Sequence, residues 1–283
     1  MPRASSMSSK LNVLVAYPYM RKGIVAELIK QQSKVNFLLD SGAFTAWKSG
    51  KPIQLDDYCR FLDALPITPW KYFALDVIGD PVKTMENYQT MVKRGYNPIP
   101  VFTPSQDFSD IEEYYKTTDI IGCGGLTEKY GPRSLLYLKK VMAHTKGRDV
   151  HLLGYTQPDY IKLFRPFSCD SSSWTRAQRY GLCDIYVGQG KYIQWTRKQA
   201  IAHPKPAIVE ALRKLGFTLS DFCKEENWRK NNIAMVVSAR SWVKYMIDAE
   251  KNIKTKLFLA VGDTNGLNTA LKEWDYWNAP SRT

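Results

Sequence analysis

Asp40, Asp76 and Asp170 each stand at the end of a short apolar run. A carboxylate at the end of a buried strand is costly unless it is paired or used. Two nearby carboxylates can act on one sugar, one attacking the anomeric carbon while the other moves protons. Their mutual repulsion also separates their pKa values. Capping of the following helix is the alternative role for each aspartate, but three such positions favour a shared functional site.

The densest group of polar side chains begins at Asp170 and runs on through three serines to Trp174, Arg176 and Arg179. We interpret Asp170 as a nucleophile and the indole and arginines after it as contacts to a polyanion. A solvated loop, or an ion pair with Asp184, is the alternative for the arginines. The adjacent serines suit either phosphate binding or a tight turn.

The composition favours a polyanionic partner. The 283 residues carry a net charge of +13, and basic residues lie close to tryptophans at several points. Lys and Arg neutralise phosphates, and aromatic rings stack on bases. A merely basic surface is the alternative. Nothing approaches the ~18 apolar residues of a membrane span. We expect residues 1–10, which are polar and lack the apolar segment of a secretory signal, to form a disordered lead-in.

The cysteines and histidines predict no metal site. The five cysteines are widely spaced, none in a CxxC pair, and the three histidines show no ligand spacing with them. Free thiols of this kind fit a reducing cytoplasm. His151 lies inside an apolar run and is interpreted as a core histidine, and Cys169 as a small buried residue.

Apolar runs alternate with helical patterns along the first 190 residues. This alternation predicts an α/β fold with a parallel sheet, and eight strands favour a (β/α)8 TIM barrel, whose strand ends open on one functional rim. An open doubly wound sheet is the alternative, although no GxGxxG follows the first run. The expected strands are 11–16, 35–39, 72–75, 98–102, one starting at 120, 150–153, 167–170 and 184–187.

The pattern changes after residue 204. We expect a catalytic core over 11–204 and a mainly helical C-terminal extension over 205–283 that packs on the barrel. The extension contains a strongly amphipathic helix over 233–247 and a possible strand over 257–261. No linker separates it from the core, and the sequence leaves its role and the oligomeric state open.

Five short motifs occur in a fixed order between residues 35 and 190. They are Asp40-Ser-Gly-Ala-Phe44, Asp76, Gly124-Gly125-Leu126, Leu153-Gly154, and the run from Asp170 to Gly181, Asp-Ser-Ser-Ser-Trp-Thr-Arg-Ala-Gln-Arg-Tyr-Gly. The ordered set resembles the motifs of the tRNA-guanine transglycosylases, enzymes that exchange guanine for a 7-deazaguanine base. The resemblance implies a glycosyltransferase of the pentosyltransferase kind.

The resemblance also implies residue roles. Asp170 attacks C1′ of a guanosine nucleotide to give a covalent glycosyl-enzyme intermediate. Asp40 serves as general acid and base, and Asp76 binds the Watson–Crick edge of the base. The other residues expected around the base are Ser41, Phe44, Gly124, Gly125, Leu153 and Gly154, and core packing is the alternative for Phe44.

Some features of the family are missing from this sequence. Its zinc motif, clustered cysteines with a histidine, has no counterpart, and its base-reading Gln has no clear match near Phe102 and Thr103. The shorter pattern is similar to the bacteriophage DNA-guanine transglycosylases, relatives of the queuosine enzymes that modify DNA. We therefore expect DNA and a 7-deazaguanine base as substrates, a cytoplasmic location (the host cytoplasm for a viral protein), and no cofactor. The alternatives are tRNA as substrate, a catalytically silent nucleic-acid-binding barrel, and a glycoside hydrolase.

Overall fold

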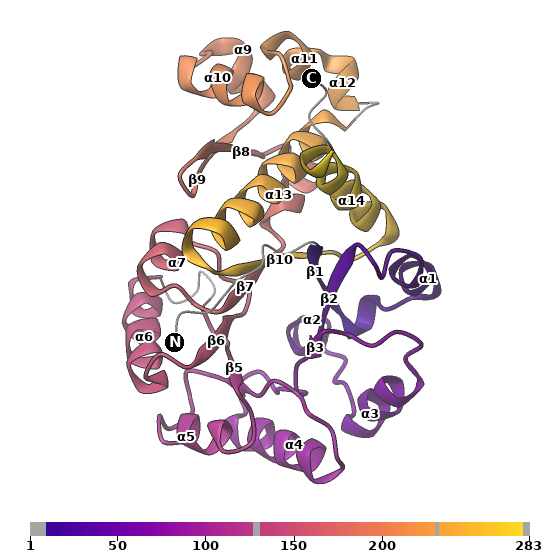
Figure 1. Cartoon of the computed structure of the whole chain (residues 1–283), viewed down its shortest axis with the longest axis vertical. Coiled ribbons are helices and arrows are strands. Elements are labelled where there is room, and N and C mark those ends of the chain that lie inside the picture. The colour runs from indigo at the N-terminus through magenta and orange to yellow at the C-terminus, as the bar shows by residue number, and fades with distance from the viewer. Residues whose placement is uncertain (1–9, 127–130, 230–231, 280–283) are drawn as a thin grey trace.

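The computed structural model describes residues 10–126, 131–229 and 232–279, without the side chains of 131–134, 178, 179 and 229. Eight parallel strands form one curled sheet in the order β3-β2-β1-β10-β7-β6-β5-β4, and helices surround its outer face (Figure 1). The predicted α/β class is confirmed. The strands of the sheet are β1 (Leu11–Ala16), β2 (Val35–Asp40), β3 (Lys71–Tyr72), β4 (Val101–Phe102), β5 (Ile120–Cys123), β6 (Asp149–Leu152), β7 (Ser168–Ser171) and β10 (Lys256–Ala260).

Helices follow most of the strands, as the alternating pattern predicted. Two short 3-10 helices, η1 (Tyr17–Tyr19) and η3 (Ser173–Thr175), directly follow β1 and β7. The α-helices are α1 (Lys22–Lys30), α2 (Ala43–Ser49), α3 (Leu55–Ala64), α4 (Pro81–Lys93), α5 (Asp110–Tyr115), α6 (Gly131–Thr145), α7 (Pro158–Phe164), α8 (Arg176–Tyr180), α9 (Arg197–Ala202), α10 (Pro206–Lys214), α11 (Leu219–Cys223), α12 (Glu225–Arg229), α13 (Ile233–Ile253) and α14 (Thr264–Asn278). In the described ranges, no helix has the length and apolar character needed to cross a bilayer.

The prediction that residues 184–187 form the eighth strand of the sheet is wrong. β8 (Cys183–Gly188) instead pairs antiparallel with β9 (Lys191–Trp195) in a separate hairpin. The eighth strand is β10, between β1 and β7. Its three central residues are buried, as a strand covered on both faces requires, whereas β9 leaves most of its side chains exposed or half-buried.

Residues 183–253 are thus inserted between two neighbouring strands of the sheet. The hairpin and helices α9 to α12 lie at one end of the molecule (Figure 1) and have a hydrophobic cluster of their own, which includes Ile185, Trp195, Leu212 and Phe222. The strand that was expected in the C-terminal extension therefore belongs to the core sheet.

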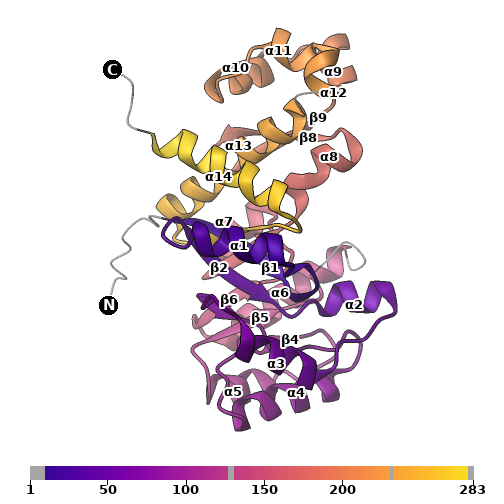
Figure 2. The same cartoon turned by 90° about the vertical axis from the view of Figure 1, so that its right-hand side faces the viewer.

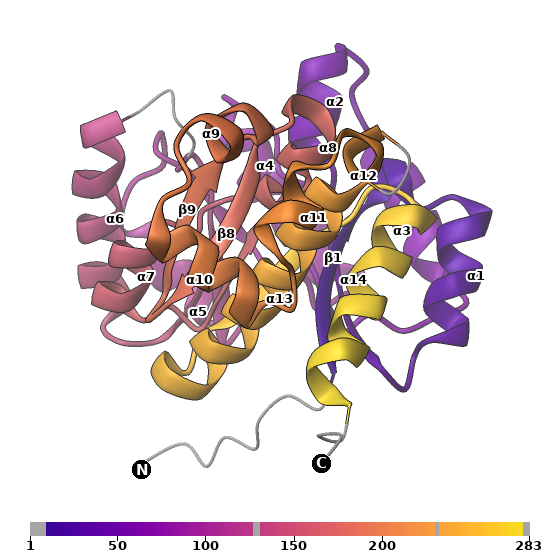
Figure 3. The same ribbon diagram turned by 90° about the horizontal axis from the view of Figure 1, so that it is seen from above.

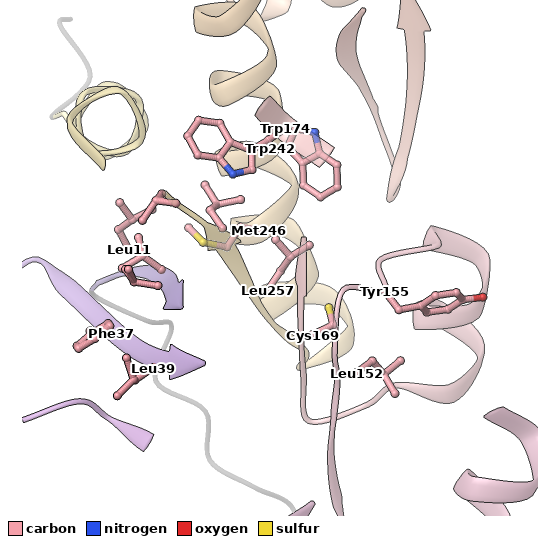
Figure 4. Packing of buried hydrophobic residues seen from close by; sticks show 14 of the residues in the cluster. Leu11, Phe37, Leu39, Leu152, Tyr155, Cys169, Trp174, Trp242, Met246 and Leu257 are labelled. Atoms are coloured by element: carbon pink, nitrogen blue, oxygen red, sulfur yellow. The ribbon is translucent and has the colours of Figure 1, made fainter. Parts of the chain in front are cut away.

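The long helix α13 packs on the strands at the centre of the sheet. Trp242 and Met246 of this helix lie beside Leu257 of β10, and Trp174 lies close by (Figure 4). These side chains are buried and belong to the largest hydrophobic cluster. Burial of that apolar surface fixes β10 between its neighbours and so sets the position of β7, the strand that contains Asp170.

The inner face of the sheet has a second apolar cluster. It contains Leu14 of β1, Leu38 of β2, Val101 of β4 and Phe258 of β10. At the ends of the sheet, backbone hydrogen bonds connect the segment after β3 to the segment before β4. Ala74 N donates to Ile99 O at 2.8 Å, and Ile99 N donates to Tyr72 O at 2.8 Å.

All eight strands run the same way, so their carboxyl ends lie on one side of the sheet. Figures 2 and 3 place α2, α8 and α9 toward the same side of the molecule. Asp40 is the last residue of β2, Asp170 is the third residue of the four-residue strand β7, and Asp76 follows β3, so all three lie toward this side. The sheet thus brings together the aspartates that the sequence singled out.

Candidate active site

Asp170 lies in β7 and is almost fully buried. Its Oδ1 accepts a hydrogen bond from Gly154 N at 2.8 Å and lies 3.1 Å from His151 Nε2. Among the described residues, the other carboxylate oxygen, Oδ2, accepts no hydrogen bond. One oxygen is therefore held by two nitrogen donors while the other remains available for chemistry.

Asp40 and Asp76 are half-buried, and Ser41, the residue after Asp40, connects their two segments. Ser41, which is fully buried, donates its hydroxyl to Asp76 Oδ1 at 2.8 Å. Gly42 N donates to Asp40 Oδ2 at 3.1 Å. Gly42 has a φ of +80°, and a Cβ there would lie 2.3 Å from Pro18 Cδ, so the turn that orients both carboxylates requires glycine.

The three carboxylates act on one another electrostatically. Burial first, and then the charges of Asp76 and Asp170, raise the pKa of Asp40 to about 7, against the backbone donors of Gly42 and Ser41. Burial also raises the pKa of Asp76 to about 6, against the hydrogen bond from Ser41. A carboxyl whose pKa lies near neutrality can both give and take a proton under physiological conditions. The predicted grouping of the three aspartates is thus present.

The alternative role of these aspartates as helix caps is not what the structure shows. α2 begins after Gly42 with no side-chain cap, and α4 is capped by Asp80, which accepts from Lys83 N at 2.9 Å. The short helix after β7 has Ser172 at its start, again without a side-chain cap. Helix capping therefore does not explain why these three aspartates stand at the ends of the strands.

His151, interpreted from the sequence as a core histidine, contacts the nucleophile candidate. It is fully buried in β6, and its Nδ1 lies 2.8 Å from Ser168 Oγ. The parallel register pairs His151 with Ser168 and places the imidazole beside Asp170 on the inner face of the sheet. Only the pairing of β6 with β7 reveals this contact, because the residues are remote in sequence.

The glycines expected to line the base pocket have clear packing roles. Gly125 has a φ of +72°, and a Cβ there would lie 2.5 Å from Pro104 Cδ. A Cβ on Gly124 would lie 3.3 Å from Val101 Cγ1. Gly154, with a φ of +63°, donates to Asp170, and the preceding Leu153 is half-buried against the inner cluster. Contact of these residues with a base remains a prediction.

Phe44 lies on the surface of α2, so the alternative of core packing is wrong. It is 52% exposed, and Trp47 on the same helix is 57% exposed, with ring centroids 5.9 Å apart. Lys48 and Lys51 are also exposed, and neither pairs with an acidic side chain in the described part of the chain. Helix α2 therefore carries an exposed aromatic pair and Lys48, and Lys51 follows the helix; Phe44 is four residues after Asp40.

Two of the expected contacts to nucleic acid have structural roles instead. Trp174 is fully buried, and its Nε1 donates to Ala260 O at 2.8 Å, so its assignment as a nucleic-acid contact is wrong. Arg176 Nη2 lies 3.4 Å from both oxygens of the fully buried Asp184, the ion pair considered as its alternative role. The side chain of Arg179 lies outside the described part of the structure.

The fold also has a surface depression away from the carboxylate cluster. An open depression of about 770 Å³ lies between α3 and α4, lined by residues that include Asp56, Asn87 and Arg94, and no carboxylate of the cluster lines it. Over residues 10–126, 131–229 and 232–279, no group of three or more His, Cys, Asp or Glu side chains is placed to hold a metal ion. The carboxylate cluster is thus the candidate site.

Comparison of the chain with known proteins assigns no function to this site. No family model matches the chain, and no curated protein matches it either. The interpretation of the site therefore depends on its residues and on the sequence resemblance.

Proposed function

We propose that the protein is a nucleic-acid transglycosylase that exchanges guanine in DNA for a 7-deazaguanine base. The observation that carries this proposal is the electrostatic coupling of Asp40 to Asp170 and Asp76 at the end of the sheet. One carboxylate with a free oxygen and another with a pKa near 7 are the two groups that double displacement at an anomeric carbon needs.

In the proposed reaction, Asp170 Oδ2 attacks C1′ of the target nucleotide. The C1′–Oδ2 bond forms as the C1′–N9 bond breaks, and Asp40 gives the departing guanine its proton. A 7-deazaguanine then attacks C1′ from the vacated side, Asp40 takes back a proton from the base, and the C1′–Oδ2 bond breaks. Asp76 binds the N1–H and amino group of each base. Two displacements retain the configuration at C1′.

The surface around the site supports a nucleic-acid substrate. A base inside a duplex is out of reach of a buried carboxylate and must be extruded. Phe44 and Trp47 offer exposed rings for stacking close to the site, and Lys48 and Lys51 offer charge for phosphates. The net charge of +13 also favours binding of a polyanion such as DNA.

We also propose that the curled sheet closes into a TIM-like barrel between β3 and β4. The bridge between Phe73 and Ile99 and the inner apolar cluster, whose members come from strands at both ends of the sheet, support closure. A cytoplasmic location fits the five free cysteines, four of which are buried.

The test is incorporation of radiolabelled 7-cyano-7-deazaguanine, or of labelled guanine, into duplex DNA, single-stranded DNA or tRNA. We expect label to enter DNA with the wild type and none with Asp170→Ala. Incorporation into tRNA alone would show that tRNA, and not DNA, is the substrate. Binding of DNA without any incorporation would indicate a nucleic-acid-binding barrel without catalytic activity. Asp119→Asn, an exposed carboxylate just before β5 and hence at the opposite edge of the sheet, is the matched control that should retain activity.

A further inference from the structure

The imidazole of His151 is held in one orientation by its surroundings. The residue is fully buried, and its ring lies with its centroid 5.1 Å from that of Phe73 and 6.1 Å from that of Phe258. Its two nitrogens contact different polar partners, Nδ1 at Ser168 Oγ and Nε2 at Asp170 Oδ1. The ring therefore bridges a buried hydroxyl and the carboxylate of the candidate nucleophile.

The chemistry of the partners fixes the direction of each hydrogen bond. An ionised carboxylate only accepts hydrogen bonds, so Nε2 of His151 carries the proton and donates it to Asp170. In the neutral imidazole Nδ1 is then an acceptor, and the hydroxyl of Ser168 donates to it. Together with Gly154 N, this gives Asp170 Oδ1 two N–H donors, both from the segment that forms and follows β6.

We infer that His151 is a positioning residue that selects Asp170 Oδ2 as the attacking atom and promotes the second displacement. The inference rests on the proposed function. When the C1′–Oδ2 bond forms, Oδ1 becomes the carbonyl oxygen of the glycosyl ester and keeps its two donors. When that bond breaks, the electron pair returns to Asp170, and the donors stabilise the carboxylate that departs from C1′.

Removal of the His151 donor should therefore slow breakdown of the intermediate more than its formation. A hydrogen bond to a charged group accounts for roughly a ten- to hundred-fold change in rate. His151→Phe keeps a ring of similar shape without a donor, and His151→Gln restores a side-chain N–H. Ser168→Ala removes the group that fixes the tautomer of His151 and should give a smaller loss.

Single-turnover kinetics on labelled DNA would measure the two steps separately, with the covalent adduct trapped by denaturation. We expect the adduct to accumulate in His151→Phe, kcat and the KM for DNA to fall together by about ten-fold or more, and His151→Gln to recover part of the loss. His144→Phe is the control, because that exposed histidine hydrogen-bonds the Lys140 carbonyl through Nδ1 and stacks on Phe108. Exchange within two-fold of wild type in a folded His151→Phe protein would overturn the inference while leaving the proposed function intact.

A spectroscopic measurement tests the contact without activity. Nitrogen-15 NMR of the wild type should show His151 protonated at Nε2, with its proton resonance shifted in Asp170→Asn. The Nδ1–H tautomer, or an unchanged resonance in Asp170→Asn, would contradict the inference even if no base exchange were found. Incorporation assays on the same samples show separately whether the transglycosylase proposal fails.

Discussion

The hydroxyl of Ser41 donates to the carboxylate of Asp76 across 2.8 Å. Ser41 is the residue after Asp40, the proposed general acid, and it thus orients the side chain proposed to bind the base. The hydrogen bond joins the ends of β2 and β3 and keeps two carboxylates of raised pKa in one place. Because burial, and for Asp40 also the neighbouring carboxylates, raises these pKa values, the cluster changes its protonation within the physiological range. The first two predictions depend on this relationship.

The rate of base exchange should have a bell-shaped pH profile. Asp76, whose pKa is about 6, must be ionised to accept hydrogen bonds from the base, and Asp40, whose pKa is about 7, must be protonated to donate to departing guanine. The value of kcat/KM should therefore fall below about pH 6 and above about pH 7, as apparent values of the coupled cluster. Asp76→Asn should remove the acid limb and Asp40→Asn the alkaline limb, both at much reduced rate. A flat profile for the wild type would argue against these roles.

Asp40→Asn should make the fold more stable at neutral pH. The pKa of Asp40 rises from 3.8 to about 7 on folding, so the native state binds more protons than the unfolded state between these values. Its contribution to stability is present below about pH 4 and is lost as pH rises through 7. The variant should therefore unfold like wild type near pH 4 and gain on the order of 2 kcal/mol at pH 8, allowing for solvent screening. Urea denaturation at both pH values measures this, and an equal gain at both would contradict the charge as its cause.

Trp47→Ala should weaken binding of single-stranded DNA without affecting the fold. The ring is largely exposed beside Phe44, and stacking of a base on an aromatic side chain contributes about 1–3 kcal/mol. Lys48→Ala should lower the slope of log affinity against log salt by about 0.7–0.9. Fluorescence anisotropy measures both effects. Leu163→Ala, on exposed surface of α7, serves as control, and equal losses in both variants would remove α2 from the nucleic-acid surface.

Arg176→Ala should destabilise the protein by about 1–3 kcal/mol. It leaves the fully buried carboxylate of Asp184 with hydrogen bonds from Trp242 and Gln194 but without its cation, and a buried charge without its ion-pair partner is costly. The double variant Arg176→Ala with Asp184→Asn should recover part of the loss in thermal unfolding. If Arg176→Ala instead unfolds like wild type and only loses affinity for DNA, the arginine is a phosphate contact and not a structural group.

The sequence predicted the first seven strands because continuous apolar runs mark strands buried on both faces. It failed at the eighth strand, since residues 184–187 show the same local pattern and pairing partners are not encoded locally. The turn Gly188-Gln189-Gly190, followed by half-polar residues 191–195, was the available signal for a hairpin.

The sequence likewise predicted part of the candidate site and missed the contacts that depend on strand pairing. Asp40, Asp76 and Asp170 were recognised because a charge at the end of an apolar run is conspicuous, and the structure groups them. His151 was not recognised, because its role depends on the register between β6 and β7. Trp174 was misassigned because a tryptophan beside an arginine looks the same in sequence whether it stacks on a base or fills the core.

The position of β10 has a consequence for biosynthesis. β1 is made first and its neighbour in the sheet is made some 240 residues later, with Val13 opposite Leu259. Until Leu257 to Ala260 leave the ribosome, β1 and β7 each present an open edge of unpaired amides and carbonyls. A nascent chain in that state is prone to aggregate and has a long loop to close, so the sheet around Asp170 is completed only after β10 has been synthesised.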